Sequence, residues 1–208
     1  MRRISLGFTF VTVFLGLVSL LSAKYTSHTK EHFLNQIDDY TATGDIIFRA
    51  GTGFWSPYFA SLDVVNGYSH AGMLFKSDRG LWFVVHAEAN DDGTDGLVKK
   101  TPLHEFIADS KKFEVKKNNM STAQKNIFVS SILTHLSQKT PFDIFFDIHD
   151  AGSKVYCTEL IWIAARIAGI NDFGFAVKLS GREFITVDSI YHSSYLEDVG
   201  RYKLLYGS

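Results

Sequence analysis

Residues 154–169, KVYCTELIWIAARIAG, contain the only cysteine of this 208-residue chain. We predict a helix over about 155–169, because Gly169 is a typical helix C-terminal signal. Cys157 then lies in the first turn, where the helix dipole and the free backbone amides stabilise a thiolate. The same amides can bind an oxyanion. The position alone allows either a catalytic cysteine or a buried cysteine that acts as a small hydrophobic side chain.

The N-terminus predicts export from the cytoplasm. Two arginines precede residues 4–23, ISLGFTFVTVFLGLVSLLSA, which carry no charge. Such a run can span a bilayer, and it also fits a secretory signal. Leu21 is unfavourable for cleavage after Ala23, so we favour an uncleaved membrane anchor over a cleaved signal, and both over a buried core helix. The preceding positive charges place residues 24–208 outside the cytoplasm, either membrane-anchored or secreted.

The composition is that of one ordered globular domain following residues 1–23. The chain is 46% hydrophobic, and its formal net charge is -1. Without a basic stripe, this charge argues against nucleic acid as a partner. A single cysteine in an exported chain has no intramolecular disulfide partner, which makes its thiol a candidate reactive group.

Hydrophobic patterning predicts an α+β arrangement, with strands in the middle of the chain and helices concentrated late. A turn at 77–80 joins two of the strands into a hairpin. Residues 52–67 and 140–154 are predicted to be mainly irregular. Strands are predicted at 44–51, 68–76, 81–89, 97–101, 111–117, 184–187 and 200–206. Helices are predicted at 29–40, 102–107, 121–139 and 155–169.

A thiolate nucleophile needs a general base within hydrogen-bond reach, and the base needs an orienting group. His70, in YSHAGML, lies near the start of a predicted strand between small residues that leave room for another element. His86 and Glu88, in VVHAEA, are two residues apart at the end of the next strand and therefore share a face. The hairpin could bring either of them beside His70.

Other chemistries have weaker support in the sequence. His70, His86, Glu88 and Cys157 are all metal-ligand types, but no tight pair such as HExxH or CxxC accompanies them. We therefore expect no metal, and no organic cofactor. Ser69 points to the opposite strand face from His70, so a serine nucleophile is not expected.

Five segments occur in order over residues 44–170: GDIIFRAGTGFWSPYFASLD, YSHAGML, VVHAEA, PFDIFFD and KVYCTELIW. Together they resemble the permuted papain-like amidases, the YiiX/YaeF-type branch of the NlpC/P60 superfamily of cysteine peptidases. In ordinary papain-like enzymes the cysteine precedes the histidine. Here His70 precedes Cys157, as a circular permutation requires. The resemblance implies an α+β fold in which an antiparallel sheet or barrel packs on the cysteine-bearing helix.

The resemblance also implies roles for the candidate residues. Cys157 corresponds to the nucleophile and His70 to the general base. Glu88 best matches the third, orienting group, although His86 could take that role itself.

Further residues match the family outside the catalytic group. Tyr156, Asp143 and Asp147 stand at recurrent family positions, and we expect Tyr156 and Asp143 to help bind substrate. Phe54 and Trp55 are expected either to form a wall of the substrate pocket or to pack in the core.

The predicted function is that of a cysteine hydrolase, an amidase or peptidase that cleaves an amide bond in a peptide or acyl-amide. Cell-wall peptides are included among its possible substrates. Two alternatives stay open. One is a lipid-directed acyltransferase or thioesterase with the same cysteine and histidine. The other is a non-catalytic binding module, in which Cys157 is unreactive.

Overall fold

The computed structural model describes residues 30–62, 66–179 and 181–204, and the predicted anchor at 1–23 lies outside them. Within these ranges no helix is long and apolar enough to cross a membrane. The chain divides into two compact units, Met1–Asp39 and Tyr40–Ser208. The first contains a helix at 30–36 and the 3-10 helix η1 (Ile37–Asp39), which together confirm the helix predicted at 29–40.

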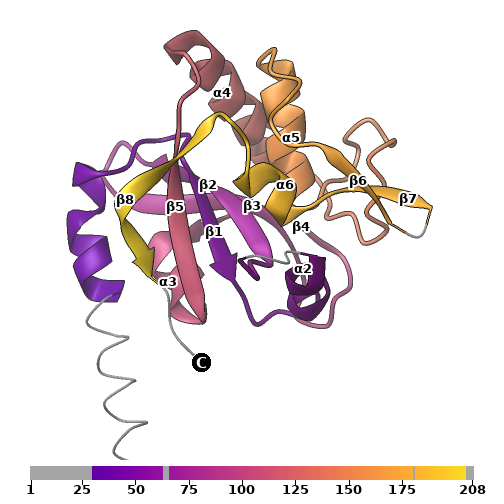
Figure 1. Cartoon of the computed structure of the whole chain (residues 1–208), viewed down its shortest axis with the longest axis horizontal. Helices are drawn as coiled ribbons and strands as arrows, with labels where there is room; N and C mark the ends of the chain where they lie inside the picture. Colours follow the sequence, from indigo (N-terminus) through magenta and orange to yellow (C-terminus); the bar gives the residue numbers. More distant parts are fainter. Residues whose placement is uncertain (1–29, 63–65, 180, 205–208) are drawn as a thin grey trace, which may run out of the picture. The chain divides into compact units, whose positions relative to one another are not determined.

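The second unit is built on a six-stranded antiparallel sheet with the strand order β4-β3-β2-β1-β5-β8 (Figure 1). This sheet confirms the predicted α+β class and antiparallel pairing. It is open, with β4 and β8 at its edges, so the barrel alternative is wrong. Its strands are β1 (Ile46–Ala50), β2 (His70–Lys76), β3 (Trp82–Ala89), β4 (Gly96–Pro102), β5 (Lys112–Asn118) and β8 (Leu196–Leu204).

Helices α4 and α5 pack together, and α5 also contacts β2 and β3 (Figure 1). Ser121 caps α4 in a capping box with Gln124, which fixes the start of this helix. The helices of this unit are α2 (Ser56–Leu62), α3 (Leu103–Ala108), α4 (Thr122–Gln138), α5 (Cys157–Ile167) and α6 (Val187–Tyr191).

The two faces of the central strands carry different side chains: one face is hydrophobic and the other is polar. One face belongs to the main hydrophobic cluster, which joins the sheet to α5 through Phe48, Met73, Val85, Leu160 and Ile161. Side chains alternate across a strand, and the register pairs Arg49 with His70 and Leu74 with Val84. The opposite face therefore carries the polar side chains Arg49, His70, His86 and Glu88. Folding of the sheet thus gathers four residues from three strands.

The C-terminal region differs most from the sequence expectation. A two-stranded sheet of β6 (Ala176–Leu179) and β7 (Arg182–Ile185) precedes α6. Neither β6 nor α6 was predicted. Helix α6 has only five residues, too few for a helical period to show, and it begins where the Thr186 side chain accepts a hydrogen bond from the amide of Ser189.

Candidate active site

Cys157 is the first residue of α5, and its surroundings hold this end of the helix in place. Glu159 Oε2 accepts a hydrogen bond from the Tyr156 amide at 3.4 Å. The Tyr156 hydroxyl accepts one from the amide of Ile185 at 2.7 Å. The cysteine itself is free and buried. The helix therefore presents one fixed thiol in its first turn.

Cys157 and His70 line the same cavity, which also has Arg49 and Glu88 in its wall and a volume of about 60 Å³. The cleft is small, so a substrate larger than its reacting group extends beyond it. Residues from α5 and from the polar face of the sheet thus meet in one place.

His70 is hydrogen-bonded to His86. Nε2 of His70 lies 2.8 Å from Nδ1 of His86, and Nε2 of His86 lies 2.9 Å from the Thr101 hydroxyl. Both bonds are satisfied when each neutral ring carries its proton on Nε2, and also in the reverse arrangement, in which His86 donates from Nδ1 and accepts from the Thr101 hydroxyl. In the first arrangement Nδ1 of His70 is unprotonated. That nitrogen is available to accept a proton in the cleft.

A glycine in β2 makes room for the histidine pair. A Cβ atom at Gly72 would lie 2.4 Å from Cγ1 of Val84 and 3.1 Å from Cβ of His86. Any larger residue would therefore displace β3 next to His86. Gly72 therefore allows the close approach of β2 to β3 beside His86.

Glu88, which the sequence analysis favoured as the orienting group, forms ion pairs with Arg49 and Lys99. Its carboxylate pairs with Arg49 at 2.5 Å and with Lys99 at 2.8 Å, and it lies 4.0 Å from Nδ1 of His86. Burial opposes its ionisation, but His70, His86 and Arg49 together lower the pKa of Glu88 to about 2. The alternative residue, His86, is the one that is hydrogen-bonded to His70.

Arg49 is a component of the cleft that the sequence analysis missed. Its Nη1 donates to the carbonyl of Phe106 at 2.6 Å, and its guanidinium carbon lies 4.1 Å from the centre of the Phe106 ring. Its Nε is buried and, among the described residues, has no hydrogen-bond partner. The available signal was a charged residue inside the otherwise apolar strand GDIIFRAG.

The resting cysteine and histidine are both neutral. Burial lowers the pKa of His70 to about 3, and the positive charge of Arg49 adds to this effect. Burial also raises the pKa of Cys157 to about 11, although the amides of Ala71 and Thr158 favour its thiolate. At neutral pH the site therefore contains a thiol and an uncharged imidazole, rather than an ion pair.

Phe54 and Trp55 lie in the wall of the cleft, where the sequence analysis allowed for them. The Phe54 side chain is 61% exposed, so it is not a core residue. Trp55 donates from Nε1 to the carbonyl of Gly93 at 3.0 Å, and its ring contacts Phe146 edge to face at 5.2 Å. These aromatic side chains form a wall between the cleft and the segment that follows α4.

Tyr156 and Asp143 are not among the residues that line the cleft. Tyr156 is fully buried, and its hydroxyl is used within the fold. The Asp143 carboxylate accepts hydrogen bonds from the amides of Phe145 and Asp147, at 2.9 and 2.5 Å. Both residues shape the segment that leads into α5, and their expected role in substrate binding stays a prediction.

A cysteine at a helix N-terminus, with a histidine on the adjacent sheet and a polar partner behind that histidine, defines the class of papain-like cysteine hydrolases. A family model described as permuted papain-like amidase enzyme, YaeF/YiiX, matches residues 40–174. The chain belongs to this family, whose activity type is that of a cysteine amidase or peptidase. The permuted order of His70 and Cys157 agrees with this membership.

The structural comparison supports the same fold. A crystal structure described as that of the metalloprotein yiiX from Escherichia coli aligns with a TM-score of 0.61 and 23% sequence identity. The alignment covers 76% of this chain and 96% of that chain. A search of curated proteins found no match.

Proposed function

We propose that this protein is a cysteine amidase that hydrolyses an amide bond in a peptide or acyl-amide, with Cys157 as nucleophile and His70 as general base. The observation that carries the proposal is the shared cleft, in which Cys157 and His70 both lie and His70 is hydrogen-bonded to His86 through Nε2. Membership of an amidase family supports the same activity.

In the first half of the reaction, Nδ1 of His70 accepts the thiol proton while Sγ of Cys157 forms a bond to the amide carbonyl carbon. The backbone amide of Cys157 donates to the developing oxyanion. His70 then returns the proton to the nitrogen as the C–N bond breaks. The amine leaves, and the acyl group remains on Cys157 as a thioester.

In the second half, His70 takes a proton from water, whose oxygen attacks the thioester carbonyl. The C–S bond breaks, the acid product leaves, and the proton returns to Sγ. Throughout, the positive Arg49 beside the cleft stabilises negative charge on sulfur and oxygen. The Glu88 carboxylate keeps Arg49 in position, and His86 keeps the His70 ring in its reactive orientation.

A metal-dependent alternative has one observation in its favour, beside the description of the Escherichia coli structure as a metalloprotein. His70, His86 and Glu88 each offer a ligand atom within 4.8 Å of the others. The present arrangement does not fit one ion, because the facing histidine nitrogens share a proton at 2.8 Å and Glu88 is paired with two cations. Two nitrogen ligands of tetrahedral zinc would lie about 3.3 Å apart. No step of the proposed reaction therefore uses a metal.

An acyl-transfer experiment tests the proposed nucleophile. The protein is mixed with p-nitrophenyl acetate, and its intact mass is followed over time. We expect one acetyl group per chain, which appears rapidly and then decays by hydrolysis. The Cys157→Ala variant should acquire none, since the chain has one cysteine. A native protein that never acquires the acetyl group would contradict the amidase and favour the binding module. Equal cleavage of a phospholipid ester and a peptide amide would favour the lipid-directed alternative.

Because Cys157 and His70 are both uncharged at neutral pH, the rate of thiol labelling should show no plateau near neutral pH. Thiolate is the reacting species, and the pKa of Cys157 is raised to about 11 by burial. The rate of iodoacetamide labelling should therefore rise about tenfold per pH unit from about pH 6 to pH 9, with no plateau. The measurement is intact mass after timed quenching. A plateau between about pH 5 and pH 7 that disappears in His70→Ala would instead demonstrate a resting thiolate–imidazolium pair.

A further inference from the structure

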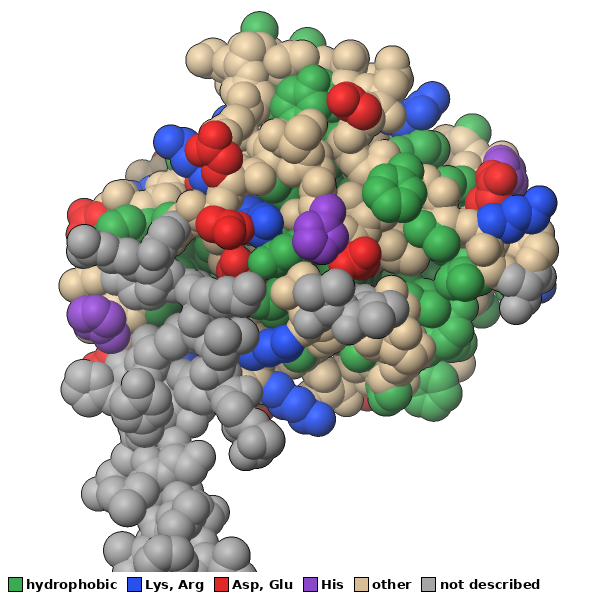
Figure 2. Space-filling view, in the orientation of Figure 1, with side chains coloured by type: hydrophobic (Ala, Val, Ile, Leu, Met, Phe, Trp, Pro, Cys, Tyr) green, Lys and Arg blue, Asp and Glu red, His purple; other side chains and the backbone are tan. Residues whose placement is uncertain are grey.

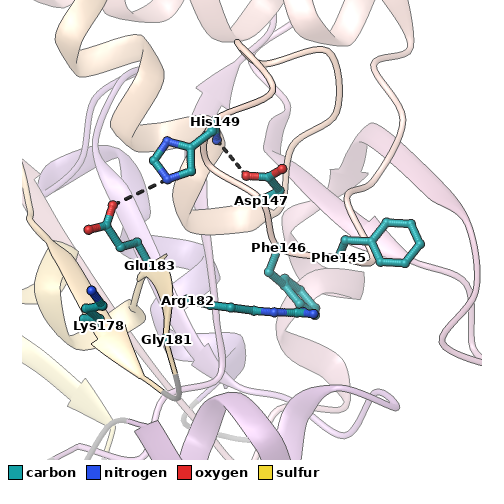
Figure 3. Close-up of a pocket in the computed structure, with 8 residues that line it drawn as sticks. All are labelled: Phe145, Phe146, Asp147, His149, Lys178, Gly181, Arg182 and Glu183. Carbon is teal, nitrogen blue, oxygen red and sulfur yellow. Dashed lines mark hydrogen bonds and ion pairs between the residues drawn. The ribbon is translucent and has the colours of Figure 1, made fainter.

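A large cavity of the second unit, of about 630 Å³, lies between residues 145–149 and the β6–β7 hairpin (Figure 3). Its two cations are balanced by two acids, and the strand register places Lys178 opposite Glu183. Figure 2 shows acidic, basic and histidine side chains side by side at this end of the unit. This cavity therefore selects no ligand charge, whereas the cleft at Cys157 contains a polar group without a partner.

The unpartnered group in the cleft is the Nε–H of Arg49. The guanidinium donates through Nη1 to the Phe106 carbonyl at 2.6 Å and through Nη2 to Glu88 at 2.5 Å. Its Nε is buried and, within the described residues, has no hydrogen-bond partner. Leaving a buried donor without an acceptor is energetically costly, so this N–H is a contact point for a ligand.

Two serine hydroxyls lie beside Gly51 together with this N–H. A Cβ atom at Gly51 would lie 3.1 Å from Ser56 Oγ. It would lie 3.6 Å from both Arg49 Nε and Ser69 Oγ. All three polar residues also line the cleft that contains Cys157. The three atoms therefore surround the side of Gly51 on which any other residue would carry a side chain, and we refer to Arg49 Nε, Ser56 Oγ and Ser69 Oγ as the Gly51 subsite.

The hydroxyls of the Gly51 subsite are available as donors. Ser69 Oγ already accepts a hydrogen bond from the Gly51 amide at 2.9 Å, so its own proton is left for another acceptor. Ser56 donates its backbone amide to the Gly53 carbonyl, and among the described residues its hydroxyl has no hydrogen-bond partner. Arg49 Nε–H can only donate. The subsite thus offers three donors to an acceptor atom of a ligand.

The acceptor that fits the Gly51 subsite is a neutral carbonyl oxygen. Arg49 and Lys99 are both paired with Glu88, and Asp91 lies in the cleft wall. The formal charges of these four groups sum to zero, so a carboxylate finds no uncompensated cation there. A carbonyl oxygen accepts hydrogen bonds from the same donors without adding charge.

We infer that the Gly51 subsite binds a second carbonyl oxygen of the substrate, on the acyl side of the scissile amide. The inference rests on the proposed function, because it deepens the identity of the substrate on which Cys157 acts. The acyl portion stays on Cys157 through both halves of the reaction, so a contact with it serves both. A peptide has such a carbonyl in the preceding residue, whereas a simple fatty acyl-amide has only the scissile one. The substrate class is therefore a peptide, with Arg49, Ser56 and Ser69 as specificity determinants.

The test compares two acyl-amides that differ in one carbonyl oxygen. Binding of 4-oxopentanoyl p-nitroanilide and of pentanoyl p-nitroanilide to the Cys157→Ala protein is measured by titration calorimetry. The 4-oxo group stands where the preceding carbonyl of a peptide stands. Because one of its donors is charged, we expect the oxo compound to bind about tenfold more tightly. Ser56→Ala should reduce this preference about threefold. Gly51→Ala should reduce it to about twofold or less, because the new Cβ fills the space between the donors.

The glycine variants are matched in the loop that they change. Gly51 does not have a positive φ, so alanine is compatible with its backbone conformation. Gly53→Ala is the control, because a Cβ atom there would meet only Ser56 Oγ, at an ordinary contact distance of 3.8 Å. This variant should keep the full preference for the oxo compound. Thermal unfolding curves verify that each variant is folded.

Three results would overturn the inference. These are equal affinity for both ligands, an unchanged preference in Gly51→Ala, and tighter binding of succinyl p-nitroanilide, which has a carboxylate in place of the ketone. The last would assign the subsite to carboxylates. The binding assay requires no turnover. A preference for the oxo compound in a protein that p-nitrophenyl acetate never acylates would therefore remove the amidase and leave the Gly51 subsite as a ligand site.

Discussion

Replacement of His70 with alanine should lower kcat for amide hydrolysis by about 10³-fold or more. The variant retains the Cys157 thiol, whose pKa is about 11, but it lacks the base that would accept the thiol proton. Steady-state kinetics on a peptide or acyl-amide substrate measure the effect, and a thermal unfolding curve verifies the fold. His104→Ala is the control, because the His104 side chain is 67% exposed and lies outside the cleft. A loss below about tenfold would remove His70 as the base.

The same assay separates His86 from Glu88 as the orienting group. His86→Leu removes the acceptor that faces Nε2 of His70 and should lower kcat by about 10- to 100-fold with little change in KM. His86→Asn should recover most of this loss, because an asparagine Oδ1 lies one bond beyond Cγ, as the histidine Nδ1 does. Glu88→Gln should change kcat only a few-fold. A large loss in Glu88→Gln together with an unaffected His86→Leu would restore the original assignment of Glu88.

Glu159→Gln should stabilise the protein at alkaline pH. The Glu159 side chain is fully buried, and its Oε1 has no partner among the residues described. Burial raises its pKa to about 9, and the charges of Asp150 and Asp143 add to this shift. In the unfolded chain the carboxyl ionises near its ordinary value of 4.5, whereas the folded state keeps the proton until about pH 9. Stability is therefore complete below the unfolded pKa and declines as the pH rises between these values.

Glutamine retains the acceptor for the Tyr156 amide and removes the titration. The variant should have a free energy of unfolding similar to that of the native protein at about pH 4.5, and one roughly 2 to 4 kcal/mol higher at about pH 8. Urea unfolding at both pH values measures this difference, with the exposed Glu105→Gln as control. A variant equally destabilised at both pH values would show that the Glu159 carboxylate is ionised and needed in the folded protein.

The central elements were predictable because they depend on local patterns. Alternating side chains and turn residues indicated the hairpin of β2 and β3, and the glycine at 169 indicated the end of the cysteine helix. The quoted segments also indicated the permuted papain-like fold, which the family match and the structural neighbour confirm. The barrel was not excluded by sequence, since closure depends on whether β4 and β8 meet, and no local signal reports this.

Local sequence patterns could not predict which side chain, His86 or Glu88, is hydrogen-bonded to His70. Sequence spacing placed His86 and Glu88 on one strand face, and it could not choose between them. The choice depends on Arg49 and Lys99, which come from β1 and β4 and form ion pairs with the Glu88 carboxylate. Strand register sets these distances, so only the assembled sheet decides which group remains beside His70.

The sequence by itself determined the residue types and their local settings: a lone thiol in the first turn of a helix, and histidines within short apolar strands. These features follow from side-chain periodicity and backbone capping, which act over a few residues. The tertiary structure alone decided that His86 is hydrogen-bonded to His70 and that Arg49 borders the cleft. Each of these depends on contacts between segments distant in the chain, where competing partners and burial set both the geometry and the pKa values.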